Sequence, residues 1–106
     1  MNEVLLLETS FANREEALKL GRQLIEEKLV ACAQVGTSPV VSIYSWKGKI
    51  EEEEEYLLSL KSLPEIADKL QARLAELHSY ETPQILSKVY KVETSYAAWV
   101  KLVLAG

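Results

Sequence analysis

Cysteine, histidine and long apolar runs are almost missing from this sequence. Cys32 is the only cysteine among 106 residues, so no intramolecular disulfide can form, and a reducing, cytoplasmic location is the natural expectation. The apolar run 4–7 is too short for a signal peptide or a membrane span, and no basic residue precedes it. We therefore expect a cytoplasmic protein without a membrane partner.

Clusters of basic residues are missing as well. The formal net charge is −4 at pH 7, and lysine and arginine are scattered along the chain. Binding to a phosphate backbone needs a basic patch, so nucleic acid is not an expected partner. No glycine-rich phosphate loop is visible either, which argues against a nucleotide site.

Hydrophobic residues make up 48% of the chain, which is enough to build a core. Residues 1–106 therefore read as a single domain. The periodicity of apolar positions predicts alternating elements along the chain. These are a strand at 4–9, a helix at 13–28 capped by Asn13, a strand at 30–46 interrupted at 36–39, a strand at 50–61, a helix from 62–64 to His78, a strand at 83–92, and a final short helix capped by Thr94 or Ser95.

This order gives two split β-α-β halves followed by a helix. With right-handed crossovers, it predicts an α+β fold, the ferredoxin-like split β-α-β sandwich, in which two helices cover one face of an antiparallel sheet. Gly21 lies on the apolar face of the first helix, so we expect that helix to approach the sheet closely there.

The second and third strands form a hairpin that is long for a domain of this size. Gly48 supplies the turn between them. Arms of more than ten residues at ~3.3 Å each span roughly 40 Å, whereas a chain of this length has a radius of gyration of about 13 Å. The hairpin should therefore project beyond its own domain and pack on something else, for which we expect another copy of the chain.

Three segments in this order resemble one known family. They are Glu27-Lys28-Leu29-Val30-Ala31-Cys32-Ala33-Gln34, Ser42-Ile43-Tyr44-Ser45-Trp46-Lys47-Gly48-Lys49-Ile50-Glu51 and His78-Ser79-Tyr80-Glu81-Thr82-Pro83-Gln84-Ile85. The family is CutA, the divalent-cation tolerance proteins. The resemblance implies a ferredoxin-like subunit, a homotrimer similar to that of the PII signalling proteins, and a non-enzymatic cytoplasmic protein to which copper binding is often credited.

Few residues of this sequence could serve as the metal ligands that the resemblance implies. His78 is the only histidine, and Glu8 stands at the end of the first strand, where a thiol can lie in members credited with copper binding. His78 and Glu8 are therefore the candidate ligands for copper or another divalent cation. The other interpretation of His78 is that it sits at a helix C-terminus and interacts favourably with the helix dipole.

Two further features have both a functional and a structural interpretation, and a third is a candidate ligand site. Cys32 could be a reactive thiol, but its strand position favours burial as a small apolar residue. The run Glu51–Glu55 could attract Ca²⁺ or Mg²⁺, but alternate strand residues face opposite ways, which favours a solvated strand surface. Tyr80, Glu81 and Lys61 are the candidate ligand-binding residues of an inter-subunit cleft.

Two functions follow from these features. The first is a homotrimeric divalent-cation tolerance protein without catalytic activity. The alternative is a PII-like trimeric signalling module that binds a small metabolite or nucleotide at the inter-subunit clefts. Either would work with a protein or small-molecule partner that the sequence does not identify. No nucleophile, base and orienting group can be assembled from the sequence, so an enzyme is not expected.

Overall fold

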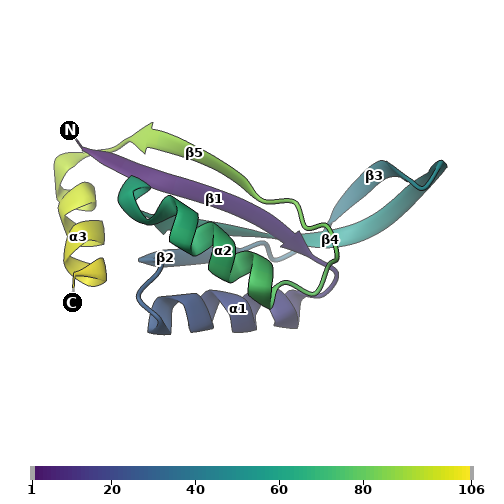
Figure 1. Cartoon of the computed structure of the whole chain (residues 1–106), viewed down its shortest axis with the longest axis horizontal. Helices are drawn as coiled ribbons and strands as arrows, with labels where there is room; N and C mark the ends of the chain where they lie inside the picture. Colours follow the sequence, from purple (N-terminus) through teal and green to yellow (C-terminus); the bar gives the residue numbers. More distant parts are fainter. Residues whose placement is uncertain (1, 106) are drawn as a thin grey trace.

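The computed structural model describes residues 2–105, and its central element is the N-terminal strand (Figure 1). This strand is hydrogen-bonded on both sides, as its apolar sequence predicts. The elements in chain order are β1 (Glu3–Phe11), α1 (Arg14–Glu26), β2 (Cys32–Val35), β3 (Val40–Trp46), β4 (Lys49–Ser62), the short 3₁₀ helix η1 (Pro64–Ile66), α2 (Ala67–Leu77), β5 (Leu86–Lys91) and α3 (Thr94–Leu104).

All strand pairs in the sheet are antiparallel, and the order across it is β2-β4-β1-β5. Both α1 and α2 connect strands that are consecutive along the chain but not neighbours in the sheet, and both helices lie on the same face of the sheet. The predicted ferredoxin-like arrangement is confirmed. β3 pairs only with β4, beyond the part of β4 that contacts β2.

The core lies between the sheet and the two helices. β1 contributes Leu5 and Leu7, and β4 contributes Leu58 and Leu60, all with 3% of their surface exposed or less. Each pair is spaced by two residues, because alternate strand residues face the same way. The residues between them, such as Leu6, therefore point to the opposite face, which neither α1 nor α2 covers.

Local sequence sets both ends of α1. The side chain of Asn13 accepts a hydrogen bond from the backbone N–H of Glu16 at 2.8 Å, which confirms the predicted cap. The helix ends at Glu26 rather than Lys28, because Lys28 has left-handed backbone (φ 57°). The backbone N–H of Leu29 then bonds the carbonyl of Leu24 at 3.0 Å, a Schellman-type ending.

Gly21 brings α1 against the sheet, as predicted. A Cβ atom at this position would lie 3.1 Å from the Cβ of Ala33 on β2 and 3.6 Å from a methyl group of Leu58 on β4. Glycine is thus the residue that fits the closest contact between α1 and the sheet.

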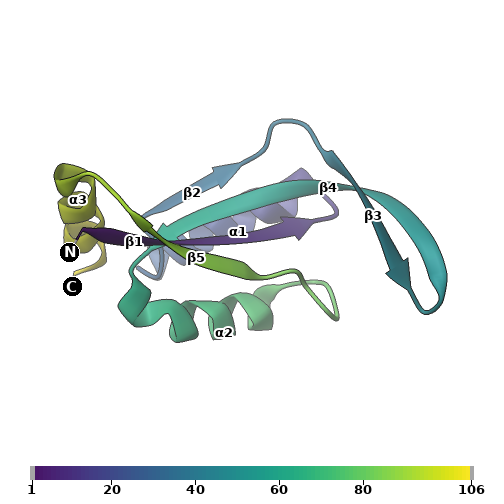
Figure 2. The same cartoon turned by 90° about the horizontal axis from the view of Figure 1, so that it is seen from above.

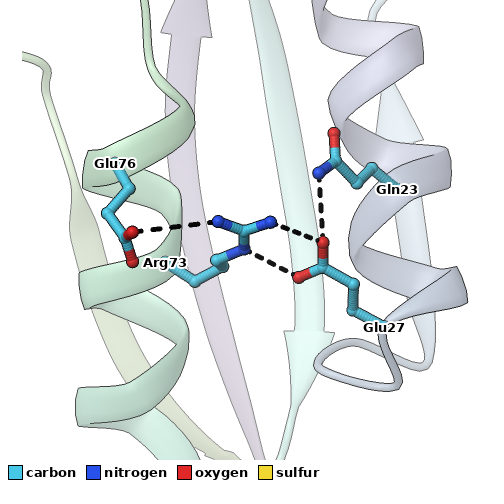
Figure 3. A network of polar contacts seen from close by, with 4 residues as sticks. All are labelled: Gln23, Glu27, Arg73 and Glu76. Carbon is cyan, nitrogen blue, oxygen red and sulfur yellow. Dashed lines mark hydrogen bonds and ion pairs between the residues drawn. The ribbon is translucent and has the colours of Figure 1, made fainter.

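An ion pair joins the C-terminal end of α1 to the middle of α2 (Figure 3). Arg73 on α2 reaches Glu27, the C-cap residue of α1, and donates two hydrogen bonds of 2.8 Å to its carboxylate. Gln23 donates a third at 3.0 Å, and Glu76 lies 3.8 Å from the guanidinium. The hydrogen bonds from Arg73 and then from Gln23 lower the pKa of Glu27 from 4.5 to about 2.

Two sequence predictions need correction. The strand predicted at 30–46 is two strands, because the segment 36–39 leaves the ladder completely after Gly36 donates to the carbonyl of Leu57. The cap of α3 is Glu93, not Thr94 or Ser95. Its carboxylate accepts from the backbone N–H groups of Ser95 and Tyr96 at 3.0 and 3.2 Å, because a longer acidic side chain one residue earlier reaches the same donors.

The hairpin of β3 and β4 extends past the body of the domain, as predicted (Figure 1), but its first arm β3 has 7 residues rather than the expected more than ten. The molecule measures 45 × 25 × 24 Å and has a radius of gyration of 14.6 Å, above the ~13 Å of a compact chain of this length. Its two-residue turn has positive φ at both Lys47 (50°) and Gly48 (81°). This is the type I′ geometry that matches the twist of the strands, and Figure 2 shows how strongly the hairpin curves.

α3 lies at the end of the sheet opposite the hairpin (Figure 1). Its Val100 packs with Val4 and Ala31 in a second, smaller cluster. Within residues 2–105, no helix is long and apolar enough to cross a bilayer.

Candidate functional site

A hollow of about 760 Å³ lies between the hairpin and the loop 79–84 that connects α2 to β5. One face of the hairpin forms its wall. Glu51, Glu53 and Glu55 alternate along β4 and are paired across the ladder with Tyr44, Ser42 and Val40. Tyr44, Trp46 and Tyr80 also line the hollow, so its surface is both acidic and aromatic.

Among these carboxylates, Glu55 is the one held by hydrogen bonds from the body of the domain. The hydroxyls of Tyr80 and Ser10 both donate to its Oε2 atom, at 2.8 and 3.1 Å. Burial alone would raise the pKa of Glu55, but the hydrogen bonds from Ser42, Tyr80 and Ser10 outweigh it, so the pKa lies below its usual value. Glu55 therefore stays ionised and links three segments of the chain.

The pKa values of the two tyrosines in the hollow are shifted upwards, in the opposite direction to that of Glu55. Burial, followed by the hydrogen bond to Glu55, raises the pKa of Tyr80. Burial and then the neighbouring Glu53 raise the pKa of Tyr44. Both phenols therefore stay protonated as hydrogen-bond donors, and neither is poised to act as a general base at neutral pH.

His78 lies behind this hollow, with only 8% of its surface exposed. Its Nδ1 atom accepts a hydrogen bond from the backbone N–H of Tyr80 at 3.0 Å. Its Nε2 atom lies 2.9 Å from the backbone oxygen of Ser10 and 3.1 Å from the hydroxyl of Thr9. The ring stacks on Phe11 with centroids 4.2 Å apart and planes inclined by 12°.

These contacts define the state of His78. An atom that accepts an N–H bond carries no proton, so the proton sits on Nε2 and is donated to the Ser10 oxygen. Burial lowers the pKa of His78, and the backbone bond to Ser10 and the charges of Glu16 and Glu55 only partly oppose it. Both nitrogens are therefore used within the chain, and the ring is held against β1 rather than against the last carbonyls of α2.

The two predicted metal ligands are not brought together. His78 contacts Thr9, so it lies on the helix-covered face of β1. Glu8 is the preceding strand residue and points to the other face, where Ser59 donates to it at 3.5 Å. Among residues 2–105, no three histidine, cysteine or acidic side chains gather in a way that could hold a metal ion.

The three predicted cleft residues divide between two places. Tyr80 and Glu81 line the acidic hollow. Lys61 lies six residues beyond Glu55 on β4, beside a smaller hollow of about 290 Å³. Its amine donates a hydrogen bond to the side chain of Gln34. Within one chain they do not form one site, so the predicted cleft would need a second copy.

The glutamate run divides between the two faces of the hairpin, as alternation requires. Glu52 and Glu54 lie opposite Ile43 and Val41, away from Glu51, Glu53 and Glu55. The sequence interpretation of a wholly solvated strand missed the bound state of Glu55. The usable signal was its position, since Glu55 is the last residue of the run and the last residue of β4 that pairs with β3.

Cys32 is half-buried, not buried as expected. It pairs with Lys61, which in turn pairs with Leu6, and all three point to the face that α1 and α2 leave uncovered. The strand position was predicted, but the lack of a covering helix on that face was not considered.

Known proteins match this chain over nearly its whole length. The family model described as CutA1 divalent ion tolerance protein matches residues 5–102. A divalent-cation tolerance protein CutA of Thermotoga maritima is 37% identical over 99 residues, which cover 92% of this chain and 96% of that protein.

Comparison with solved structures leads to the same family. CutA1 of Ehrlichia chaffeensis superposes with a TM-score of 0.91 at 27% identity and covers 96% of this chain and 95% of its own. A protein of Archaeoglobus fulgidus described as periplasmic divalent cation tolerance protein CutA has a TM-score of 0.89 at 25% identity, over 96% and 99% of the two chains. The chain therefore belongs to the CutA1 divalent ion tolerance protein family.

Proposed function

We propose that this chain is a non-enzymatic divalent-cation tolerance protein whose working unit is a homotrimer. The observation that carries the proposal is the pair of unpaired strand edges with apolar side chains. β3 has β4 on one side only, and all six residues of the outer strand β5 are exposed. On the hairpin, Val41, Ile43 and Ile50 are 61%, 65% and 81% exposed.

Such surfaces support self-assembly for two reasons. Open, apolar strand edges readily pair with another chain, and folded proteins cover them. The hairpin and β5 are different surfaces, so a contact between them is head-to-tail and can close into a ring. A ring of three copies would bury the hairpin and cover the open face around Leu6 and Cys32.

Copper binding through His78 and Glu8 of a single chain is not part of the proposal. Both ring nitrogens of His78 are engaged, and the sheet separates the two side chains. Copper favours nitrogen and sulfur donors, whereas the hairpin presents carboxylate oxygens, which suit harder divalent cations. The relatives are named for cation tolerance, so the PII-like alternative is not proposed.

The proposed site of action is the cytoplasm, where the half-exposed thiol of Cys32 would stay reduced. Absence of catalysis is proposed because three of the titratable side chains in the hollow are not poised for proton transfer at neutral pH. Glu55 is ionised and accepts hydrogen bonds from Ser42, Tyr80 and Ser10, while Tyr80 and Tyr44 have raised pKa values.

Light scattering tests the assembly. The wild-type protein should have the mass of three chains and keep it on dilution, and a stable monomer would contradict the proposal. The charge introduced by Ile43→Lys should dissociate it. Lys69→Glu, on the exposed side of α2 and outside the proposed interface, is the control and should leave the mass unchanged.

Calorimetric titration tests the cation part. Because His78 has no free lone pair, His78→Ala should not change copper binding to the assembled protein. Loss of copper binding in this variant would identify His78 as a copper ligand and refute this part of the proposal.

A further inference from the structure

The smaller hollow, of about 290 Å³, lies on the face of the sheet that α1 and α2 leave uncovered. Val4 and Leu6 reach it from β1, Lys61 reaches it from β4, and Tyr90 reaches it from β5. Tyr96 reaches it from the first turn of α3, which lies beside the start of β1 (Figure 2). The hollow is therefore bounded by both the sheet and the C-terminal helix.

The lining of this hollow is apolar apart from positive charge. Val4, Leu6 and Val92 supply aliphatic side chains, and the charged side chains among its described lining residues are Lys61 and Lys91. No carboxylate among residues 2–105 lines it, although the whole chain has 16 acidic residues against 12 lysines and arginines. The charge of the hollow is thus opposite in sign to the net charge of the protein.

The charge of Lys61 has no acidic partner within residues 2–105. Its amine donates to the neutral side-chain oxygen of Gln34, and the salt bridges of Arg73 lie elsewhere. Glu8 points to the same face one row further along the ladder, but it accepts from Ser59 instead. Lys61 is therefore available to an anion in the hollow.

Two tyrosine rings stand at the sides of the hollow. Tyr90 is 44% exposed, and the amine of Lys88 lies 5.3 Å from the centre of its ring. The ring of Tyr96 packs against Trp99, with centroids 5.8 Å apart. Since aromatic rings pack well against other rings, the hollow suits a flat apolar body.

The size of the hollow and its donors narrow the choice of anion. A water molecule occupies about 30 Å³ of liquid, so 290 Å³ holds a molecule of roughly ten non-hydrogen atoms. Phosphate is best bound by the forked guanidinium of arginine or by the backbone N–H groups of a helix start, and the residues that line this hollow include no arginine. A carboxylate attached to a ring meets both the single amine and the apolar floor.

We propose that this hollow binds a small aromatic monocarboxylate, whose carboxylate pairs with Lys61 and whose ring lies on Val4 and Leu6 beside the two tyrosines. The inference goes beyond the proposed function, which assigns no ligand to this face. The proposed homotrimer covers the same face, and a covered lysine without a counter-charge is costly. A bound carboxylate removes that cost, so binding and assembly favour each other.

Calorimetric titration of the wild-type protein with benzoate is the first test. Benzoate should bind in a one-to-one ratio with the chain. Benzylamine, which has a similar shape and the opposite charge, should not bind, and neither should inorganic phosphate. Absence of saturable benzoate binding, or equal binding of benzylamine, would overturn the proposal.

Nuclear magnetic resonance locates the bound probe. The ring current of benzoate should shift the methyl signals of Val4 and Leu6, which line the hollow. The methyl signals of Val41 and Ile43 on the hairpin should stay in place. Shifts confined to the hairpin would put the probe elsewhere and overturn the assignment.

Two variants test the charge and the shape of the site separately. Lys61→Met removes the charge and should weaken benzoate binding by about tenfold or more, as expected for a hydrogen bond to a charged group. Leu6→Trp fills the floor, leaves the lysine in place and should also weaken binding. Lys69→Met on the exposed side of α2 is the matched control and should bind as wild type does. Unchanged methyl signals of Leu58 in the core verify the fold, and full affinity in either hollow variant would refute the site.

Light scattering on the same samples separates this inference from the proposed assembly. A trimer that binds no benzoate would contradict this inference alone, whereas a monomer that binds it would contradict the trimer alone. Benzoate should leave the mass of the assembled protein unchanged. If the mass falls as benzoate is added, a carboxylate of the neighbouring copy occupies the hollow, and the proposal of a ligand is wrong.

Discussion

Replacing Gly21 with alanine sets two measurable effects against each other. In the interior of a helix, alanine is more favourable than glycine by about 1 kcal/mol. The added Cβ, however, would lie only 3.1 Å from the Cβ of Ala33. The net change in stability therefore reports how tightly α1 packs on β2.

The steric effect should be larger. Ala33 lies in the ladder opposite Leu60, and its Cβ has no rotatable bond by which it could move away. Relief requires a backbone shift of α1 or β2, and overpacking of this kind costs about 1–3 kcal/mol. After subtracting the gain in helix propensity, we expect Gly21→Ala to destabilise the protein by about 1 kcal/mol.

Urea unfolding at fixed protein concentration measures this change, since assembly would make stability depend on concentration. In an Ala33→Gly background the obstructing atom is gone, and the same substitution should instead stabilise by about 1 kcal/mol. Arg22→Gly compared with Arg22→Ala gives the propensity difference on the exposed side of the same turn. If Gly21→Ala stabilises equally in both backgrounds, the argument for a close approach is wrong.

Three further predictions follow from single contacts. Ser62→Ala should destabilise by about 1–3 kcal/mol in urea unfolding, because the fully buried hydroxyl donates to the carbonyl of Leu29 at 2.7 Å and that acceptor would be left unpaired; no loss would mean that water replaces it. Glu27 is stabilised as a carboxylate by Arg73, so its contribution is complete above its usual pKa of 4.5 and is lost as pH falls towards 2. The stability difference between wild type and Glu27→Gln should shrink over that range, and a constant difference would exclude the linkage. The thiol of Cys32 should react more slowly with an aromatic disulfide in assembled protein than in the dissociated Ile43→Lys variant, and equal rates would show that assembly leaves that face open.

The long hairpin was predictable because it depends on local rules. Gly48 allows the turn, and alternation along the glutamate run fixes which carboxylates share a face. The order of helices and strands was likewise predictable, since each element has a clear apolar period.

The environment of His78 was not predictable from its neighbours in sequence. Its partners Thr9 and Ser10 are 69 and 68 residues away and come from the opposite end of the chain. The helix-end interpretation used only local position, whereas the ring is fixed by tertiary packing on Phe11. The cap at Glu93 was missed for a simpler reason, because Ser and Thr are the usual caps and both follow it directly.

The central place of β1 has a consequence for how the chain is made. This strand is synthesised before both of its neighbours, β4 and β5, and Glu3 pairs with Lys91. At the usual synthesis rate of about 5–20 residues per second, several seconds pass between the synthesis of β1 and that of β5, the neighbour made last. Until β5 is made, this edge of β1 has no partner within the sheet, and truncation before β5 would leave it open.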